Sequence, residues 1–101
     1  MRVRTEALHF DADQKLLDFI DEKINKLTRF HDQILDAKVV LKLENNSSKI
    51  KDKVVEVHLQ VPGDIVIAKA DDKTFEAAVA SAADTLERNL KKQKSKLTNR
   101  N

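Results

Sequence analysis

The chain has 101 residues and a formal net charge of +2, and 41% of its residues are hydrophobic. This length suits one domain around one core, which leaves little room for a deep ligand pocket. There is no cysteine, so disulfides and thiolate metal sites are excluded. No apolar run approaches the roughly 20 residues that span a bilayer, and the N-terminus runs directly into a strand-like pattern. We therefore expect a cytoplasmic protein without membrane contact.

Hydrophobic periodicity predicts three elements in the first half of the chain. Residues 2–8 alternate between apolar and polar, as in a half-buried strand. The Asp-Ala-Asp stretch at 11–13 offers N-caps for a helix over 12–30, where apolar residues recur at helical spacing. Residues 37–43 alternate again, and the polar stretch 45–48 then predicts a loop.

Two further strands and a long helix are predicted in the second half. A strand over 54–61 ends at Pro62-Gly63, which matches the central positions of a type II turn. The next strand, over 65–70, carries apolar residues on both faces, so its inward face is ambiguous. Asp71, Asp72 and Thr74 are candidate caps for a final helix over 75–97.

The resulting order, β-α-β-β-β-α, predicts an α+β fold. The strand–helix–strand start favours a right-handed crossover if those two strands are parallel neighbours, and the short loops that follow favour an antiparallel meander. Strands with one polar face need cover on one side only, and two amphipathic helices supply it. We expect a two-layer sandwich with a four-stranded mixed sheet, both helices on one face, and the other face in water.

The residues that carry catalysis are nearly absent from the sequence. One glycine cannot form a phosphate-binding loop, no serine has a histidine at a suggestive spacing, and there is no cysteine nucleophile. The three histidines, His9, His31 and His58, fall on separate elements and are expected to be unrelated surface or edge residues. A helix cap explains Asp71-Asp72 more simply than a catalytic carboxylate pair does. We expect no enzyme, no cofactor, no metal site and no small-molecule substrate.

Charge is distributed unevenly along the chain. From Arg88 to the C-terminus there are six basic residues and no acid, whereas the rest of the chain holds 13 basic and 17 acidic residues. A basic segment on a near-neutral body is typical of a protein that contacts a polyanion. A solvated helix end, where Lys and Arg also favour the macrodipole, explains the same run equally well.

The aromatic residues indicate how such a protein would bind RNA. All four are phenylalanines, and none falls within a predicted strand, so the sheet offers no platform for base stacking. Binding would instead rely on phosphates, sugars and shape. The basic residues that can serve lie on both helices and one strand: Lys15, Lys23, Lys26, Arg29, Lys38, Lys42, Arg88, Lys91, Lys92, Lys94 and Lys96.

The sequence resembles the short ribosome hibernation-promoting factors and the related ribosome-associated translation inhibitors. The resemblance covers nearly the whole chain. It lies in the run from Leu17 to Leu27 with its "DEKINKL" segment, in "VVLKLE" at residues 39–44, and in "DTLERNLKKQKSKL" at residues 84–97. The last block is similar to the closing helix of the family.

The resemblance implies a β-α-β-β-β-α domain that binds the bacterial small ribosomal subunit near the decoding centre. There it would overlap the paths of messenger RNA and transfer RNA, and would inhibit translation in idle cells by occlusion, without chemistry. The implied contacts to 16S ribosomal RNA are the basic residues at matching positions: Lys23, Lys26, Lys42, Arg88, Lys92, Lys94 and Lys96.

Two features depart from the family pattern. The family often has Tyr at the position of Glu76 and Asp at that of Ala80; here Phe75, one residue earlier, is the aromatic that can replace the Tyr. Long family members also carry a second domain that pairs ribosomes. We expect residues 1–101 to form a single ribosome-binding domain without that second domain, so that ribosome dimerisation would need a separate factor.

Two other functions fit the same pattern. One is a stand-alone domain for structured RNA, similar in plan to a double-stranded RNA-binding domain. The other is a protein–protein regulator that docks through the polar sheet face or an edge strand, for which Ile65 and Ile67 are the available anchors unless they belong to the core.

Overall fold

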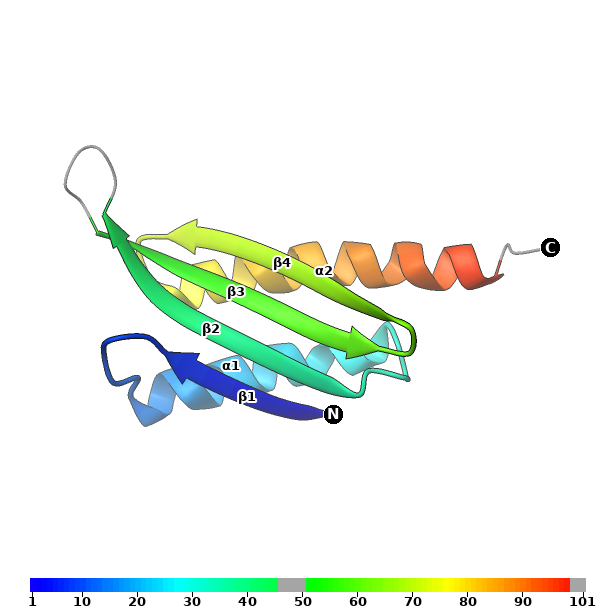
Figure 1. Cartoon of the computed structure of the whole chain (residues 1–101), viewed down its shortest axis with the longest axis horizontal. Helices are drawn as coiled ribbons and strands as arrows, with labels where there is room; N and C mark the ends of the chain where they lie inside the picture. The colour runs from blue at the N-terminus through cyan, green and yellow to red at the C-terminus, as the bar shows by residue number, and fades with distance from the viewer. Residues whose placement is uncertain (46–50, 99–101) are drawn as a thin grey trace.

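Figure 1 shows the computed structural model, which describes the backbone of residues 1–45 and 51–98 and the side chains of residues 1–44 and 52–92. The order of elements is the predicted one. In chain order they are β1 (Arg2–Ala7), α1 (Gln14–Asn25), the 3-10 helix η1 (Lys26–Arg29), β2 (Asp36–Asn45), β3 (Lys51–Val61), β4 (Asp64–Asp72) and α2 (Phe75–Thr98). The predicted loop at 45–48 lies outside the described residues, apart from the backbone of Asn45 at the end of β2.

The four strands form one mixed sheet in the order β1-β2-β3-β4. β1 pairs with β2 in parallel, as a strand–helix–strand unit allows, and β2, β3 and β4 form an antiparallel meander. β1 and β4 are therefore the two edge strands. The predicted α+β class and four-stranded mixed sheet are confirmed.

Both helices cover the same face of the sheet (Figure 1), where the alternating residues of the strands point inward. Val39, Leu41, Val57 and Leu59 of the two central strands are fully buried there. The apolar stripes of α1 and α2 pack against them, with residues such as Leu86 at 0% exposure. The residues of the opposite face are mostly polar and charged, so that face needs no cover.

The register settles the inward face of β4, which the sequence left ambiguous. Val66 and Ala68 stand opposite Leu59 and Val57 and are buried. The alternate residues Ile65 and Ile67 point to the uncovered face and are half exposed, at 50% and 52%. They are not core residues.

Local chemistry explains where the helices begin and where the last hairpin turns. The side chain of Asp13 accepts a hydrogen bond from the Leu16 amide, and Thr74 accepts one from the Ala77 amide, so these two residues cap α1 and α2. Asp71 and Asp72 instead end β4. Gly63 has a φ of 77°, the positive value that the third position of a type II turn requires.

The first helix is shorter than the sequence predicts. The α-helix starts at Gln14 and ends at Asn25, and the chain then tightens into the 3-10 turn η1. A 3-10 helix turns by about 120° per residue instead of about 100°. The prediction of one regular helix over 12–30 was therefore wrong in its ends, and Arg29 does not lie in line with the basic residues of α1.

Candidate nucleic-acid interface

The structure divides the predicted basic residues between two faces. Lys23 lies in α1, Lys26 begins η1, and Arg88 and Lys92 lie in α2, so all four belong to the helix layer. Lys42 is on β2 beside Val54, and its neighbours place it on the uncovered face of the sheet. Lys94 and Lys96 are within α2, but their side chains lie outside the described residues.

Both helices run in the same direction along the sheet, so their C-terminal halves lie toward the same end of the molecule (Figure 1). Lys23 and Lys26 are near the end of α1, and Arg88 and Lys92 are in the second half of α2. Cations favour this end of a helix because its free carbonyls carry partial negative charge. The last turns of α2 extend past the end of the sheet (Figure 1).

These cations differ in the side chains that they contact. Within the described residues, Arg88 makes only a hydrogen bond to Thr85, Lys23 lies over the Phe19 ring, and Lys92 has no ion pair. Lys26, by contrast, is 3.3 Å from a Glu22 carboxylate oxygen. Arg88 and Lys92 are exposed and four residues apart, and thus share one face of α2.

Lys42 has the most compensated charge of the set. Its Nζ lies 3.7 Å from a Glu44 oxygen and 3.9 Å from a Glu56 oxygen, and its side chain is only 30% exposed. Since both carboxylates attract it, a phosphate would have to compete with them for Lys42. Among the implied RNA contacts whose side chains are described, Lys23, Arg88 and Lys92 have no carboxylate partner, and all three belong to the helix layer.

Two other residues take roles that the sequence did not reveal. Phe75 is buried and stacks on Phe10, with ring centroids 5.1 Å apart, so it is a core residue and does not offer an aromatic surface in place of a tyrosine. Lys91 pairs with Glu87 and lies over the Phe30 ring at 5.0 Å, which ties α2 to the segment after η1.

The histidines do not form a site. His31 is buried, and its Nδ1 accepts a hydrogen bond from the Gln33 amide, whereas His58 lies on the uncovered sheet face and His9 is in the turn after β1. The expectation of surface or edge histidines was therefore wrong for His31. No group of three potential metal ligands comes together among the described residues, and no described helix is long and apolar enough to cross a bilayer.

The uncovered face carries a glutamate, Glu56, whose pKa is shifted by its neighbours. His58 Nε2 lies 2.6 Å from Glu56 Oε1, and this hydrogen bond holds the pKa of the Glu56 carboxyl below its usual value, with further help from Lys42 and Lys69. A lowered pKa means that the fold favours ionised Glu56. The resulting stability is present above the ordinary glutamate pKa and is lost as the pH falls through the folded value.

Replacing Glu56 by Gln is expected to lower the free energy of unfolding at pH 7 by up to about 1 kcal/mol, the usual range for surface pairs. Because protonation removes the same interaction from the parent protein, the difference should shrink as the pH falls below the ordinary glutamate pKa. Urea unfolding of both proteins between pH 7 and pH 3 checks this. Two curves that stay parallel over that range would show that Glu56 contributes nothing that titrates.

Comparison with known proteins identifies relatives over nearly the whole chain. The family described as "Sigma 54 modulation protein / S30EA ribosomal protein" matches residues 3–98. A "Ribosome hibernation promoting factor" of Pseudomonas putida is 36% identical over 96 residues, which are 95% of this chain and 89% of that protein. A "Ribosome hibernation promotion factor" of Deinococcus radiodurans is 35% identical over 86 residues, which are 85% of this chain but 45% of that longer protein.

A solved structure has the same fold. The ribosomal subunit interface protein of Coxiella burnetii superposes with a TM-score of 0.84 over 94% of this chain and 99% of that one, at 20% sequence identity. The family match and the Pseudomonas relative, with the shared fold, confirm the resemblance seen in the sequence. The chain belongs to the Sigma 54 modulation protein / S30EA ribosomal protein family, a family of non-enzymatic ribosome hibernation factors.

Proposed function

We propose that this protein binds the small ribosomal subunit near the decoding centre, contacts 16S ribosomal RNA, and blocks messenger RNA and transfer RNA, so that translation stops in idle cells. The observation that carries the proposal is the set of cations on the helix layer, where Lys23, Arg88 and Lys92 have no described carboxylate partner. The names of the relatives, ribosome hibernation promoting factors, support the ribosome as the target.

The contacts would be made to the RNA backbone. Arg88 and Lys92 present two neighbouring charges that can each neutralise a phosphate, and Lys23 adds a third on the adjacent helix. None of the four phenylalanines is on a strand, so base stacking on the sheet is not available. Lys94 and Lys96 remain proposed contacts on the sequence alone. Lys42 would join them only where RNA also reaches the uncovered sheet face.

The proposed mode of action is steric. The molecule is 51 Å long and 29 Å wide, large enough to fill space that a messenger or transfer RNA would otherwise occupy. Residues 1–101 would act as one ribosome-binding domain in the cytoplasm. No covalent step is involved.

Occlusion is tested by competition for the P site. Saturating protein is expected to prevent transfer RNA from binding to isolated small subunits, because both would occupy the same space. Filter binding of labelled transfer RNA measures this, with an Arg88→Ala, Lys92→Ala double variant as the matched control that should permit binding at the same concentration. Undiminished transfer RNA binding on subunits that carry the parent protein would exclude occlusion of the P site.

One observation favours docking to another protein as a second candidate function. Ile65 and Ile67 are half exposed on an edge strand, where apolar side chains can anchor a partner. An Ile65→Thr, Ile67→Thr double variant separates the two functions. The variant should bind ribosomes normally if the helix layer binds RNA. It should lose ribosome binding if the sheet face instead docks on a protein of the ribosome.

A further inference from the structure

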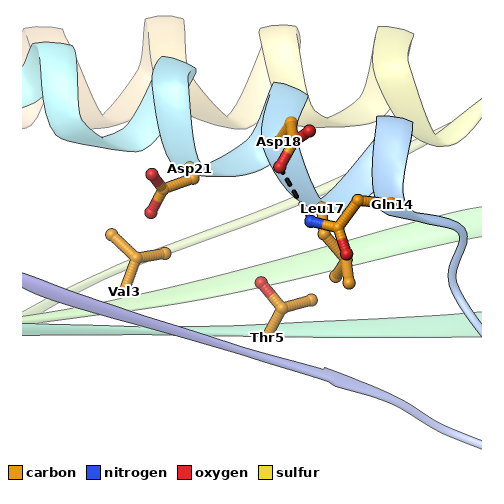
Figure 2. Close-up of a pocket in the computed structure, with 6 residues that line it drawn as sticks. All are labelled: Val3, Thr5, Gln14, Leu17, Asp18 and Asp21. Carbon is orange, nitrogen blue, oxygen red and sulfur yellow. Dashed lines mark hydrogen bonds between the residues drawn. The ribbon is translucent and has the colours of Figure 1, made fainter.

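A hollow of about 310 Å³ lies between the edge strand β1 and the helix α1. Figure 2 shows its walls: Val3 and Thr5 point from β1 toward the helix, and Gln14, Leu17, Asp18 and Asp21 come from the facing side of α1. Val3 and Leu17 give it apolar walls, while a hydroxyl, an amide and two carboxylates provide hydrogen-bonding groups. The hollow is on the opposite side of α1 from Lys23 and belongs to no part of the proposed RNA contact.

The two carboxylates in this hollow lack a cation. Asp18 accepts a hydrogen bond from the Gln14 amide at 2.8 Å, and no described basic group lies within ion-pair distance of Asp18 or Asp21. At about 100° per residue, Asp21 and Lys23 are separated by about 160° around the helix axis. One side of α1 thus attracts cations, and the other attracts phosphates.

The strand that borders the hollow has an open edge. β1 is the first strand of the sheet and pairs with β2 on one side only. The Leu8 amide bonds to the Leu41 carbonyl at 2.9 Å, so by the alternation of a strand the amides of Glu6 and Arg4 also point toward β2. The backbone groups of Val3 and Thr5 therefore point away from the sheet, where an extended chain could pair with them.

We propose that the groove along β1 binds an extended, basic segment of a partner protein. The segment would pair with the outer edge of β1, and a Lys or Arg side chain would enter the hollow. Its aliphatic stem would lie against Val3 and Leu17, and its charged end would reach Asp18 and Asp21. An added strand runs about 4.8 Å from its neighbour, and every second side chain would then face α1. This binding needs no ribosome and goes beyond the proposed function.

The first test titrates the whole chain, labelled with ¹⁵N, with the peptide acetyl-Val-Lys-Val-Lys-Val-Lys-amide. Amide shifts are expected at Val3, Thr5 and the first turns of α1. Replacing Asp18 and Asp21 by Asn should weaken binding about tenfold or more. The matched control, Asp32→Asn with Asp84→Asn, makes the same change of charge at exposed positions elsewhere and should bind as the parent does. Equal affinity for all three proteins would overturn the proposal.

Two versions of the peptide test the strand pairing without altering the protein. In one, all six amides are N-methylated, and in the other only those of the three Val residues. The first has no free amide on either edge and should lose binding in either strand direction, whereas the second keeps one free edge that can face β1 and should still bind. If the fully methylated peptide binds like the parent peptide, or if spermidine binds as tightly at the same residues, the hollow is a simple cation site. Neither test uses ribosomes. A failure of the proposed ribosome binding would therefore not be mistaken for a failure of peptide binding at this groove.

Discussion

Replacing Arg88 and Lys92 together by Ala is expected to weaken binding to the small ribosomal subunit by about two decades or more. A hydrogen bond to a charged group contributes roughly 1.5–3 kcal/mol, and about 1.4 kcal/mol corresponds to a tenfold change in affinity. The salt dependence should change as well. Each lost phosphate contact removes about 0.7–0.9 from the slope of log affinity against log salt concentration, so the double variant should lose about 1.4–1.8.

The matched control removes two cations from the other face. Arg2 and Lys69 are exposed, and both point to the uncovered side of the sheet. Their double replacement by Ala makes the same change of net charge and is expected to leave both affinity and slope near the parent values. A Lys42→Ala variant reports whether RNA also reaches that face. If the Arg88, Lys92 variant melts normally and binds ribosomes with the parent slope, this part of α2 is a solvated helix surface.

Leu86→Ala is expected to lower the free energy of unfolding by about 2–5 kcal/mol, because removing a buried leucine side chain leaves a cavity. Leu86 is fully buried between α2 and the sheet. That cost is a large part of the roughly 5–15 kcal/mol by which a domain is stable. Urea unfolding measures it, and the melting temperature should fall by about 4–8 °C for each kcal/mol in a domain of this size.

Leu35 supplies the control for this change. It is 61% exposed, and its backbone amide bonds to the Gln60 carbonyl, which an Ala side chain does not disturb. Leu35→Ala deletes the same atoms and should cost less than about 0.5 kcal/mol, as exposed substitutions usually do. Similar losses for the two leucines would show that α2 does not pack as described.

The fold was predictable because the hydrophobic periodicity of the sequence matches the faces that the strands and helices bury against one another. Alternation in the first three strands marked a single buried face, Pro62-Gly63 marked the turn, and the two capping residues, Asp13 and Thr74, were among the predicted candidates. The end of α1 was not predictable from periodicity, since Leu27 continues the apolar stripe through the change to a 3-10 turn. The inward face of β4 required the register, because both of its faces are apolar.

The candidate surface was only partly predictable. The basic residues of the helices could be read from the sequence, but ion pairs across strands could not, and Lys42 is held by Glu56 of the neighbouring strand. Phe75 appeared available until its stacking on Phe10 was visible. The hollow beside β1 depends on how α1 packs against the sheet. Its only trace in the sequence is the polar stripe Gln14, Asp18 and Asp21 at helical spacing.

Sedimentation through a sucrose gradient tests ribosome binding most directly. Cell lysate is fractionated at 50 mM and at 200 mM salt, and the protein is detected across the fractions. With five to seven phosphate contacts, affinity should fall by roughly two to four decades between these salt concentrations. The protein should therefore travel with small subunits or whole ribosomes at low salt and leave them at high salt. A protein confined to the top fractions at 50 mM salt would contradict ribosome binding.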